Sequence, residues 1–298
     1  MIDSLEGLAT ILKTPAVLAV ADKYYGLGNR VRSLLGAKVL ARTEGRAFAY
    51  TWPTGKNFGA RFDQLWDFDA PVISTAVSRL AATRFPYRDH KLHWLDDEAR
   101  AAHLWQVRTP HALVLPPGCP SWESELQALS PSAAVRANVI SAAEKGTAER
   151  AFIGVMIRTN TNAHKETLHH SPLQWYMKRM GEIRDQWPDV GFYVSADTPA
   201  AFLEIEQTFA NCQGTAYKGP YNSKQALTAS VVDLYMLASS CHLLGPHYSS
   251  FPELSQHLAG KQLRLETSMT GPESVLVTLD GLTIAPNPIQ PFARRQLG

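Results

Sequence analysis

Short apolar runs alternate with stretches of helical periodicity along this chain. Residues 16–21 form an uninterrupted apolar run with the length of a buried strand. After a glycine turn at 26–30, apolar residues recur at helical spacing until Gly45, which is expected to end that helix. Residues 46–52 then have the pattern of a second strand, closed by Pro53. The order strand, turn, helix, strand is typical of a parallel sheet.

A second series of the same kind begins near residue 151. It predicts strands at 151–157, 191–195 and 243–245, and helices at 172–187, 199–209, 231–238 and 250–258. Between the two series, residues 63–105 mix aromatic and charged side chains without a clear period. Prolines then gather between 110 and 131, before a helix expected at 133–145. We therefore predict a doubly wound α/β protein of two Rossmann-like domains, at 1–147 and 148–298.

Composition narrows the class of protein. The chain has 298 residues and a net charge of +2, and 45% of its residues are hydrophobic. These values exclude a disordered chain and argue against a dedicated nucleic-acid binder. No apolar run approaches the roughly 18 residues of a membrane span, and the first residues lack the pattern of a secretion signal. Three widely spaced cysteines predict reduced thiols, without a disulfide or a zinc site, so we expect a cytoplasmic protein.

The glycine turn at 26–30 invites comparison with dinucleotide-binding sites. A dinucleotide fingerprint needs a third glycine where this chain has Val31, and the acidic ribose partner about 20 residues further on is missing. A tight turn that uses glycines for positive φ is the simpler interpretation. An NAD(P)-binding oxidoreductase therefore stays a remote alternative.

Polar residues follow three of the predicted strands of the second series. Ligands of open α/β sheets bind beyond the carboxyl ends of the strands. Arg158, at the first of these ends, suits a pyrophosphate or a surface ion pair. Asp197, at the second, either caps the helix that begins at Pro199 or accepts hydrogen bonds from a ribose or a base. After the third strand, His247 precedes Ser249 and Ser250, which open a helix and form a candidate phosphate site.

A histidine-rich segment follows Arg158. His164, His169 and His170 lie near Glu166, but their spacing is not that of the H-E-x-x-H metal motif, and no metal is expected. Glu166 is instead a candidate general base. The absence of a G-x-S-x-G element argues against a serine hydrolase.

Taken together, these segments resemble the bacterial nodulation fucosyltransferases and the wider α1,6-, α1,2- and protein O-fucosyltransferase superfamily. The order and approximate spacing of the motifs match that superfamily from Gly26 to Gly260. The matching segments are residues 26–30, 41–52, 154–158, 193–199, 232–234 and 249–251.

The resemblance implies a GT-B fold, in which two Rossmann-like domains face across a cleft. The first domain would lie on the acceptor side, and the second would hold a GDP-sugar, with the tail at 266–298 packing back on the first. It also implies inverting transfer of fucose without a metal or other cofactor. The residues that match the superfamily's functional positions are Arg158 for the β-phosphate, Asp197 for guanine or ribose, Asp233 for the donor pocket, Ser249 and Ser250 for the diphosphate, Glu166 as base, and Gly28, Asn29 and Arg30 in the loop facing the cleft.

The chain departs from the superfamily pattern around the diphosphate. Met156 replaces the histidine of the usual H-x-R motif, Thr159 replaces a second arginine, and Thr161 and Asn162 replace an Asp-Lys pair. The leading hypothesis is a fucosyltransferase acting on a glycan, peptide or small-molecule acceptor. The alternatives are a catalytically impaired relative that binds nucleotide sugars, or a GT-B transferase using another nucleotide sugar. Aromatic faces for the acceptor are suggested by Trp52, Trp66, Trp94 and Trp105.

Overall fold

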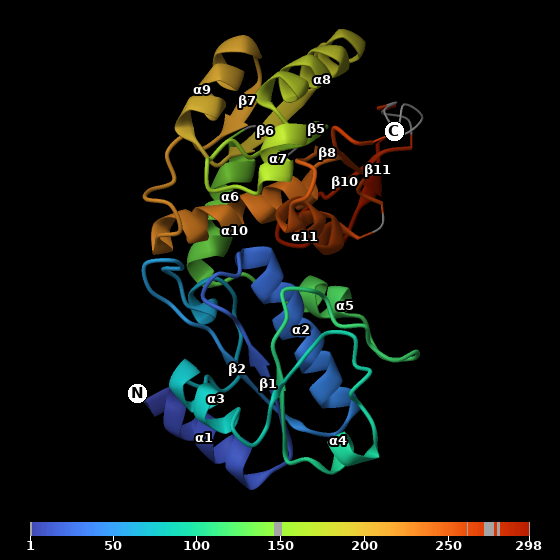
Figure 1. Cartoon of the computed structure of the whole chain (residues 1–298). Helices are drawn as coiled ribbons and strands as arrows, with labels where there is room; N and C mark the ends of the chain where they lie inside the picture. Colours follow the sequence, from blue (N-terminus) through green and yellow to red (C-terminus); the bar gives the residue numbers. More distant parts are fainter. Residues whose placement is uncertain (1, 146–150, 261, 271–276, 279–280, 298) are drawn as a thin grey trace. The chain divides into compact units, whose positions relative to one another are not determined.

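The computed structural model describes residues 2–145, 151–260, 262–270, 277–278 and 281–297 (Figure 1). The chain divides into two compact units, residues 1–130 with 222–224, and residues 131–221 with 225–298. The predicted boundary at 147/148 falls among residues 146–150, outside the described residues. The division at 130/131 places helix α6 (Ala133–Glu144) in the second unit.

The first unit is built on a parallel four-stranded sheet of order β2-β1-β4-β3. Its strands are β1 (Ala16–Val20), β2 (Ala47–Thr51), β3 (Tyr87–Arg88) and β4 (Leu104–Val107). Every residue of β1 is buried, which explains its unbroken apolar run, because parallel strands are covered on both faces. The helices of this unit are α1 (Ile2–Lys13), α2 (Leu27–Thr43), α3 (Thr75–Ala81), α4 (Asp97–Ala101) and α5 (Trp122–Ala128), with a 3₁₀ turn, η1, at Phe62–Gln64.

The second unit contains a parallel five-stranded sheet of order β7-β6-β5-β8-β9. Its strands are β5 (Phe152–Ile157), β6 (Gly191–Ala196), β7 (Cys212–Gly214), β8 (His242–Leu244) and β9 (Leu265–Glu266). Besides α6, its helices are α7 (Lys165–His170), α8 (Leu173–Gln186), α9 (Pro199–Thr208), α10 (Lys224–Ser239) and α11 (Ser250–Ala259). From β5 the chain builds outward through β6 and β7, then returns to β8 and β9 on the other side. The strand order therefore reverses between β5 and β8, a topological switch point.

The described residues of the tail have contacts within the second unit, and the expectation that the tail packs back on the first unit stays a prediction. Val277, Leu282 and Ile284 belong to the hydrophobic core around β5 and β6. Strands β10 (Thr283–Ile284) and β11 (Arg295–Gln296) form an antiparallel pair. Arg294 donates to the carbonyl oxygens of Ala238, at 2.7 Å, and of Ser240. None of the described helices has both the length and the apolar composition to cross a membrane.

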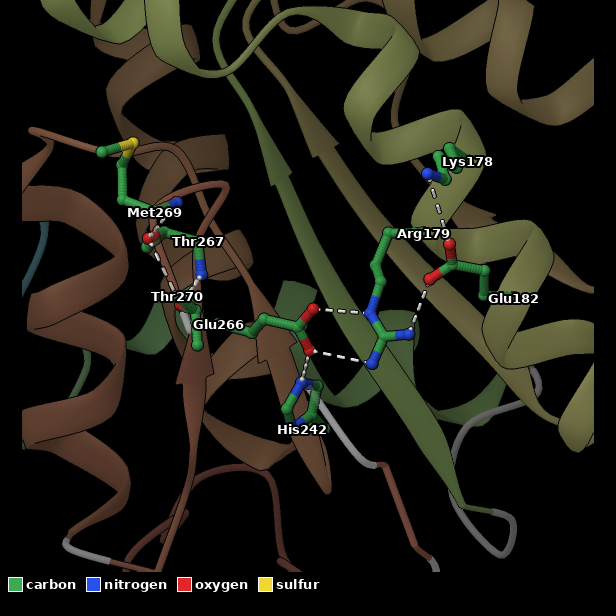
Figure 2. Close-up of polar contacts among 8 residues, drawn as sticks. All are labelled: Lys178, Arg179, Glu182, His242, Glu266, Thr267, Met269 and Thr270. Atoms are coloured by element: carbon green, nitrogen blue, oxygen red, sulfur yellow. Dashed lines mark hydrogen bonds and ion pairs between the residues drawn. The ribbon is translucent and has the colours of Figure 1, made fainter. Parts of the chain in front are cut away.

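A buried charged cluster joins helix α8 to strands β8 and β9 of this sheet (Figure 2). Arg179 of α8 donates to both carboxylate oxygens of Glu266 in β9, at 2.5 and 3.3 Å. Nε2 of His242, in β8, lies 2.8 Å from Glu266 Oε2. Arg179 also reaches the half-exposed Glu182, at 2.9 Å. Glu266 thus has three hydrogen bonds where it is 2% exposed, as a buried carboxylate requires.

Gly154, in the motif ending at Arg158, is required by close packing. A Cβ there would lie 2.8 Å from Ser240 Oγ and 3.1 Å from Leu237 Cδ2. The Ser240 hydroxyl is held by two carbonyl oxygens and cannot easily give way. Gly154→Ala should therefore lower the free energy of unfolding by about 1–3 kcal/mol, measured in urea. Gly181→Ala is the control, because Gly181 lies in α8 with nothing within 4 Å of a Cβ, and it should stabilise by about 0.5–1 kcal/mol. Equal effects of the two changes would contradict this account.

Candidate functional site

The residues predicted at strand ends converge on the carboxyl edge of the second sheet. Arg158 follows β5, Asp197 follows β6, and His247 lies in the loop after β8. Strands β6 and β8 flank β5 on its two sides, in parallel register. These loops therefore meet at the switch point between β5 and β8 or directly beside it, where ligands of such sheets bind.

Arg158 and Asp197 form an ion pair, with 3.4 Å between Arg158 Nε and Asp197 Oδ2. Both side chains are largely buried, with exposed fractions of 25% and 15%. The other carboxylate oxygen, Asp197 Oδ1, accepts hydrogen bonds from the backbone N–H groups of Thr159, at 2.7 Å, and Asn160, at 3.1 Å. Helix α9 has Thr198 as its N-cap. Asp197 consequently holds the segment after β5 and does not cap the helix.

Met156 and Thr159, two of the positions where the chain departs from the superfamily pattern, have contacts inside the second unit. Met156 is buried in β5, 5% exposed. The Thr159 hydroxyl lies 2.6 Å from that of Thr198, so the two loops are joined by a hydrogen bond at this point. Position 156 therefore holds an apolar side chain in the core and position 159 a hydrogen-bonded hydroxyl, and neither carries a charge.

The loop after β8 leads directly into helix α11. Ser249 is the N-cap of this ten-residue helix and Ser250 its first residue, and both side chains are partly exposed. The N–H groups at the start of a helix favour an anion. The loop is fixed from the α7 side, because Thr167 Oγ1 donates to the Tyr248 carbonyl at 3.1 Å and the His247 N–H donates to Ser171 Oγ at 2.8 Å.

Tyr248 carries backbone strain at this position. Its φ is +60°, a left-handed conformation that is unusual for a bulky residue. The residue is 62% exposed, and the centroid of its ring lies 4.4 Å from that of the His164 imidazole. Strain of this kind gathers at functional sites, and sequence patterns give no sign of it.

Tyr248→Gly should stabilise the fold. Relief of the left-handed backbone contributes roughly 1–2 kcal/mol, and the added chain entropy of glycine opposes it by roughly 0.5–1 kcal/mol. We expect a net gain of about 0.5–1 kcal/mol in urea unfolding. The matched control is Tyr217→Gly, a tyrosine of similar exposure without a positive φ, which should lose stability. Equal losses in the two variants would contradict the assignment of strain.

Glu166 lies on the short helix α7 with its side chain 54% exposed. Its Oε2 is 3.2 Å from Nε2 of His170, one turn further along. The ring of His170 is in turn 5.5 Å from that of His247. The structure therefore brings Glu166 and two imidazoles to the edge that carries Ser249. Within the described ranges, no group of three or more His, Cys, Asp or Glu side chains is arranged to hold a metal ion.

Asp233, on α10, is buried and contacts residues of β6. Its carboxylate accepts from the Tyr193 hydroxyl at 2.8 Å and from Ser195 Oγ at 2.7 Å, and pairs with Lys218 Nζ at 2.5 Å. Burial and the Asp233 charge raise the pKa of Tyr193 well above its usual value. Lys218 also donates to the Ala196 carbonyl at the end of β6. Asp233 thus supports the end of β6 through Lys218, a residue that the sequence patterns did not single out.

The loop residues predicted to face the cleft have contacts inside the first unit. Arg30 is fully buried, and its guanidinium donates to the carbonyls of Tyr25, at 2.9 Å, and Pro53, at 2.8 Å. Burial lowers its pKa to about 10. Gly28 is buried within α2, and Asn29 Oδ1 accepts from Arg32 at 2.7 Å. Arg30 is thus held by backbone carbonyls inside the first unit, and its predicted place in a loop that faces the cleft stays a prediction.

Two other predictions about the first unit change. Gly26 has φ −68° and caps α2, so the turn does not use a left-handed glycine. Trp52, Trp66 and Trp105 are core residues, at most 7% exposed, and offer no face to an acceptor. Trp94 is half-buried, and its indole N–H donates to the Asp89 carbonyl. The prediction of free thiols is confirmed for Cys119, Cys212 and Cys241.

Comparisons with known proteins show which solved structures share this architecture. No family model matches the chain, and no curated protein matches its sequence. Three similar solved structures are fucosyltransferases. NodZ from Bradyrhizobium is 15% identical over 80% of this chain and 92% of its own, with a TM-score of 0.54. POFUT1 in complex with GDP is 10% identical over 86% and 99%, with a TM-score of 0.55. FUT1 from Arabidopsis thaliana is 13% identical over 92% and 77%, with a TM-score of 0.57.

These similarities define the class of fold. The chain has the GT-B fold of the fucosyltransferases, as its motifs predicted. The resemblance to that superfamily is therefore confirmed at the level of the fold, and activity has to be argued from the site.

Proposed function

We propose that this chain is an inverting, metal-independent glycosyltransferase that transfers fucose from GDP-fucose to a hydroxyl of a glycan or another acceptor. The observation that carries the proposal is that Arg158 follows β5 while the loop leading into α11 follows the neighbouring strand β8, so both lie at the carboxyl edge of the second sheet at its switch point. Similar structures that contain GDP or GDP-fucose support the choice of donor.

In the proposed reaction, the acceptor oxygen forms a bond to the anomeric carbon from the face opposite the phosphate. The bond between that carbon and the β-phosphate oxygen breaks, and GDP departs with the electron pair. Arg158 and the N–H groups at the start of α11 stabilise the charge that develops on GDP. The hydroxyl proton passes to the Glu166 carboxylate, beside His170. Attack from the opposite face inverts the anomeric configuration.

Glu166→Gln tests the base. The amide cannot accept the hydroxyl proton, so kcat should fall by about 10²-fold or more, with GDP affinity unchanged. The measurement is initial rate across a range of pH, together with GDP titration. Glu204→Gln, an exposed glutamate on α9, is the control and should keep full activity. Full activity of Glu166→Gln at every pH would remove Glu166 from the mechanism.

A ligand screen tests the function as a whole. We expect GDP and GDP-fucose to raise the melting temperature. At a ligand concentration one hundred times Kd, binding should add about 2.7 kcal/mol to the free energy of unfolding. UDP, ADP and NAD(P) should have no effect, and transfer should persist in EDTA. Stabilisation by no nucleotide would overturn the proposal, and stabilisation by NAD(P) would favour the oxidoreductase.

The second candidate is a nucleotide-sugar-binding relative without transferase activity. It is favoured by the loss of charged groups at Met156 and Thr159, which here serve packing. Calorimetry showing GDP binding, with neither transfer nor donor hydrolysis, would select it over the transferase.

A further inference from the structure

Both carboxylate oxygens of Asp197 face the residues that follow β5. Oδ1 accepts from the N–H groups of Thr159 and Asn160, at 2.7 and 3.1 Å, and lies 3.5 Å from the Thr159 hydroxyl. Oδ2 lies 3.4 Å from Arg158 Nε. A nucleoside at this carboxylate would have to compete with three consecutive residues of the protein itself.

These contacts take the place of strand-to-strand hydrogen bonds at the point where β5 and β6 end. The last pair between β5 and β6 is Ile157 with Ala196, and the Asp197 N–H donates to the Ile157 carbonyl at 3.2 Å. Beyond this point Thr159 and Asn160 lie outside any strand, so their N–H groups need an acceptor other than the sheet. The largely buried Asp197 carboxylate supplies it through charge-assisted hydrogen bonds. Asp197 therefore fixes the path of the chain on both sides of Arg158.

The ion pair also orients the Arg158 side chain. Arg158 Nε lies 3.4 Å from Asp197 Oδ2 without a hydrogen bond between the two atoms, so the contact is electrostatic, and the two terminal nitrogens form a planar fork that matches two phosphate oxygens. Met156 and Thr159 contribute no positive charge here. The orientation of one guanidinium consequently matters more than it would in a site with several cations.

We propose that Asp197 is a positioning residue, which presents Arg158 to the diphosphate and does not bind guanine or ribose. This inference rests on the proposed function for the identity of the diphosphate. It assigns Asp197 a different role from the one that the sequence motif implies.

The test compares three probes by calorimetry: GDP, inorganic pyrophosphate and guanosine. In Asp197→Ala, the affinities for GDP and pyrophosphate should fall by the same factor, about tenfold to a hundredfold, and guanosine affinity should not change. Asp197→Asn keeps an acceptor oxygen for the two N–H groups and loses the charge beside Arg158. It should therefore show a smaller loss for the same two probes.

Amide hydrogen exchange gives a second measurement that needs no ligand. Exchange at Thr159 and Asn160 should accelerate in Asp197→Ala and much less in Asp197→Asn. Asp185→Ala, an exposed aspartate on α8, is the control and should change neither binding nor exchange at these amides. If Asp197→Ala does not fold, Asp197→Asn carries the comparison alone.

The outcomes separate the two proposals. Loss of GDP and guanosine affinity with unchanged pyrophosphate affinity would overturn the positioning role and leave the proposed function standing. Wild-type protein that binds neither GDP nor pyrophosphate would overturn the proposed function, and the positioning role with it.

Discussion

Arg158→Ala should slow fucose transfer by about 10²–10³-fold, the usual effect of removing one preorganised group that stabilises transition-state charge. The loss should appear mainly in kcat, with a smaller loss of GDP affinity, because negative charge on the β-phosphate grows as the glycosidic bond breaks. Initial rates at saturating donor, together with GDP titration, measure the two effects separately.

Two further variants sharpen this experiment. Arg158→Lys keeps the charge and loses the planar fork, so it should recover only part of the rate. Lys178→Ala removes one positive charge from the exposed surface of α8 and should leave the rate unchanged. Unchanged turnover in Arg158→Ala would remove this residue from the reaction.

The size of the expected effect follows from the uncharged residues on either side of Arg158 and from the partners of Lys218. Met156 is buried, and Thr159 is hydrogen bonded to Thr198. Lys218 lies near the end of β6, but its ammonium group pairs with Asp233 and donates to a backbone carbonyl. Arg158 is thus the residue on which charge stabilisation at the diphosphate mainly depends in this proposal.

The sequence predicted the central strands well because burial leaves a direct signal. Strands β1, β5 and β6 end within one residue of their predicted ends, and all three are covered on both faces and apolar apart from Ser195 in β6. Strands β7 and β9 have three and two residues, too few for any period to show. In β4, the buried Gln106 breaks the apolar run, and its partners, Ser78 and Phe85, are distant in sequence.

For the site, strand-end reasoning brought Arg158 and Asp197 to one edge, because parallel strands end together. The roles of the site residues stay predictions. Arg30 and Asp233 are charged residues whose partners are backbone carbonyls or side chains far along the chain. A lone charge in a sequence gives no sign of such partners, so a buried structural charge and a ligand-binding charge have the same pattern.

The buried cluster of Arg179, Glu266 and His242 carries the largest stability effect that we expect (Figure 2). Glu266→Gln removes the negative charge and leaves the 8% exposed Arg179 without its main partner. Removing one partner of a buried ion pair costs about 3–5 kcal/mol, because the half-exposed Glu182 that still contacts Arg179 only partly replaces the buried negative charge. Urea unfolding followed by circular dichroism measures the loss.

Glu182→Gln is a close control, since Glu182 contacts the same guanidinium at 2.9 Å with a side chain that is 45% exposed. Water screens that pair, so its loss should cost no more than about 1 kcal/mol. Arg179→Met combined with Glu266→Gln should cost much less than the sum of the two single changes, because the second removes a group that has already lost its partner. A Glu266→Gln protein as stable as Glu182→Gln would mean that the carboxylate contributes its hydrogen bonds and not its charge.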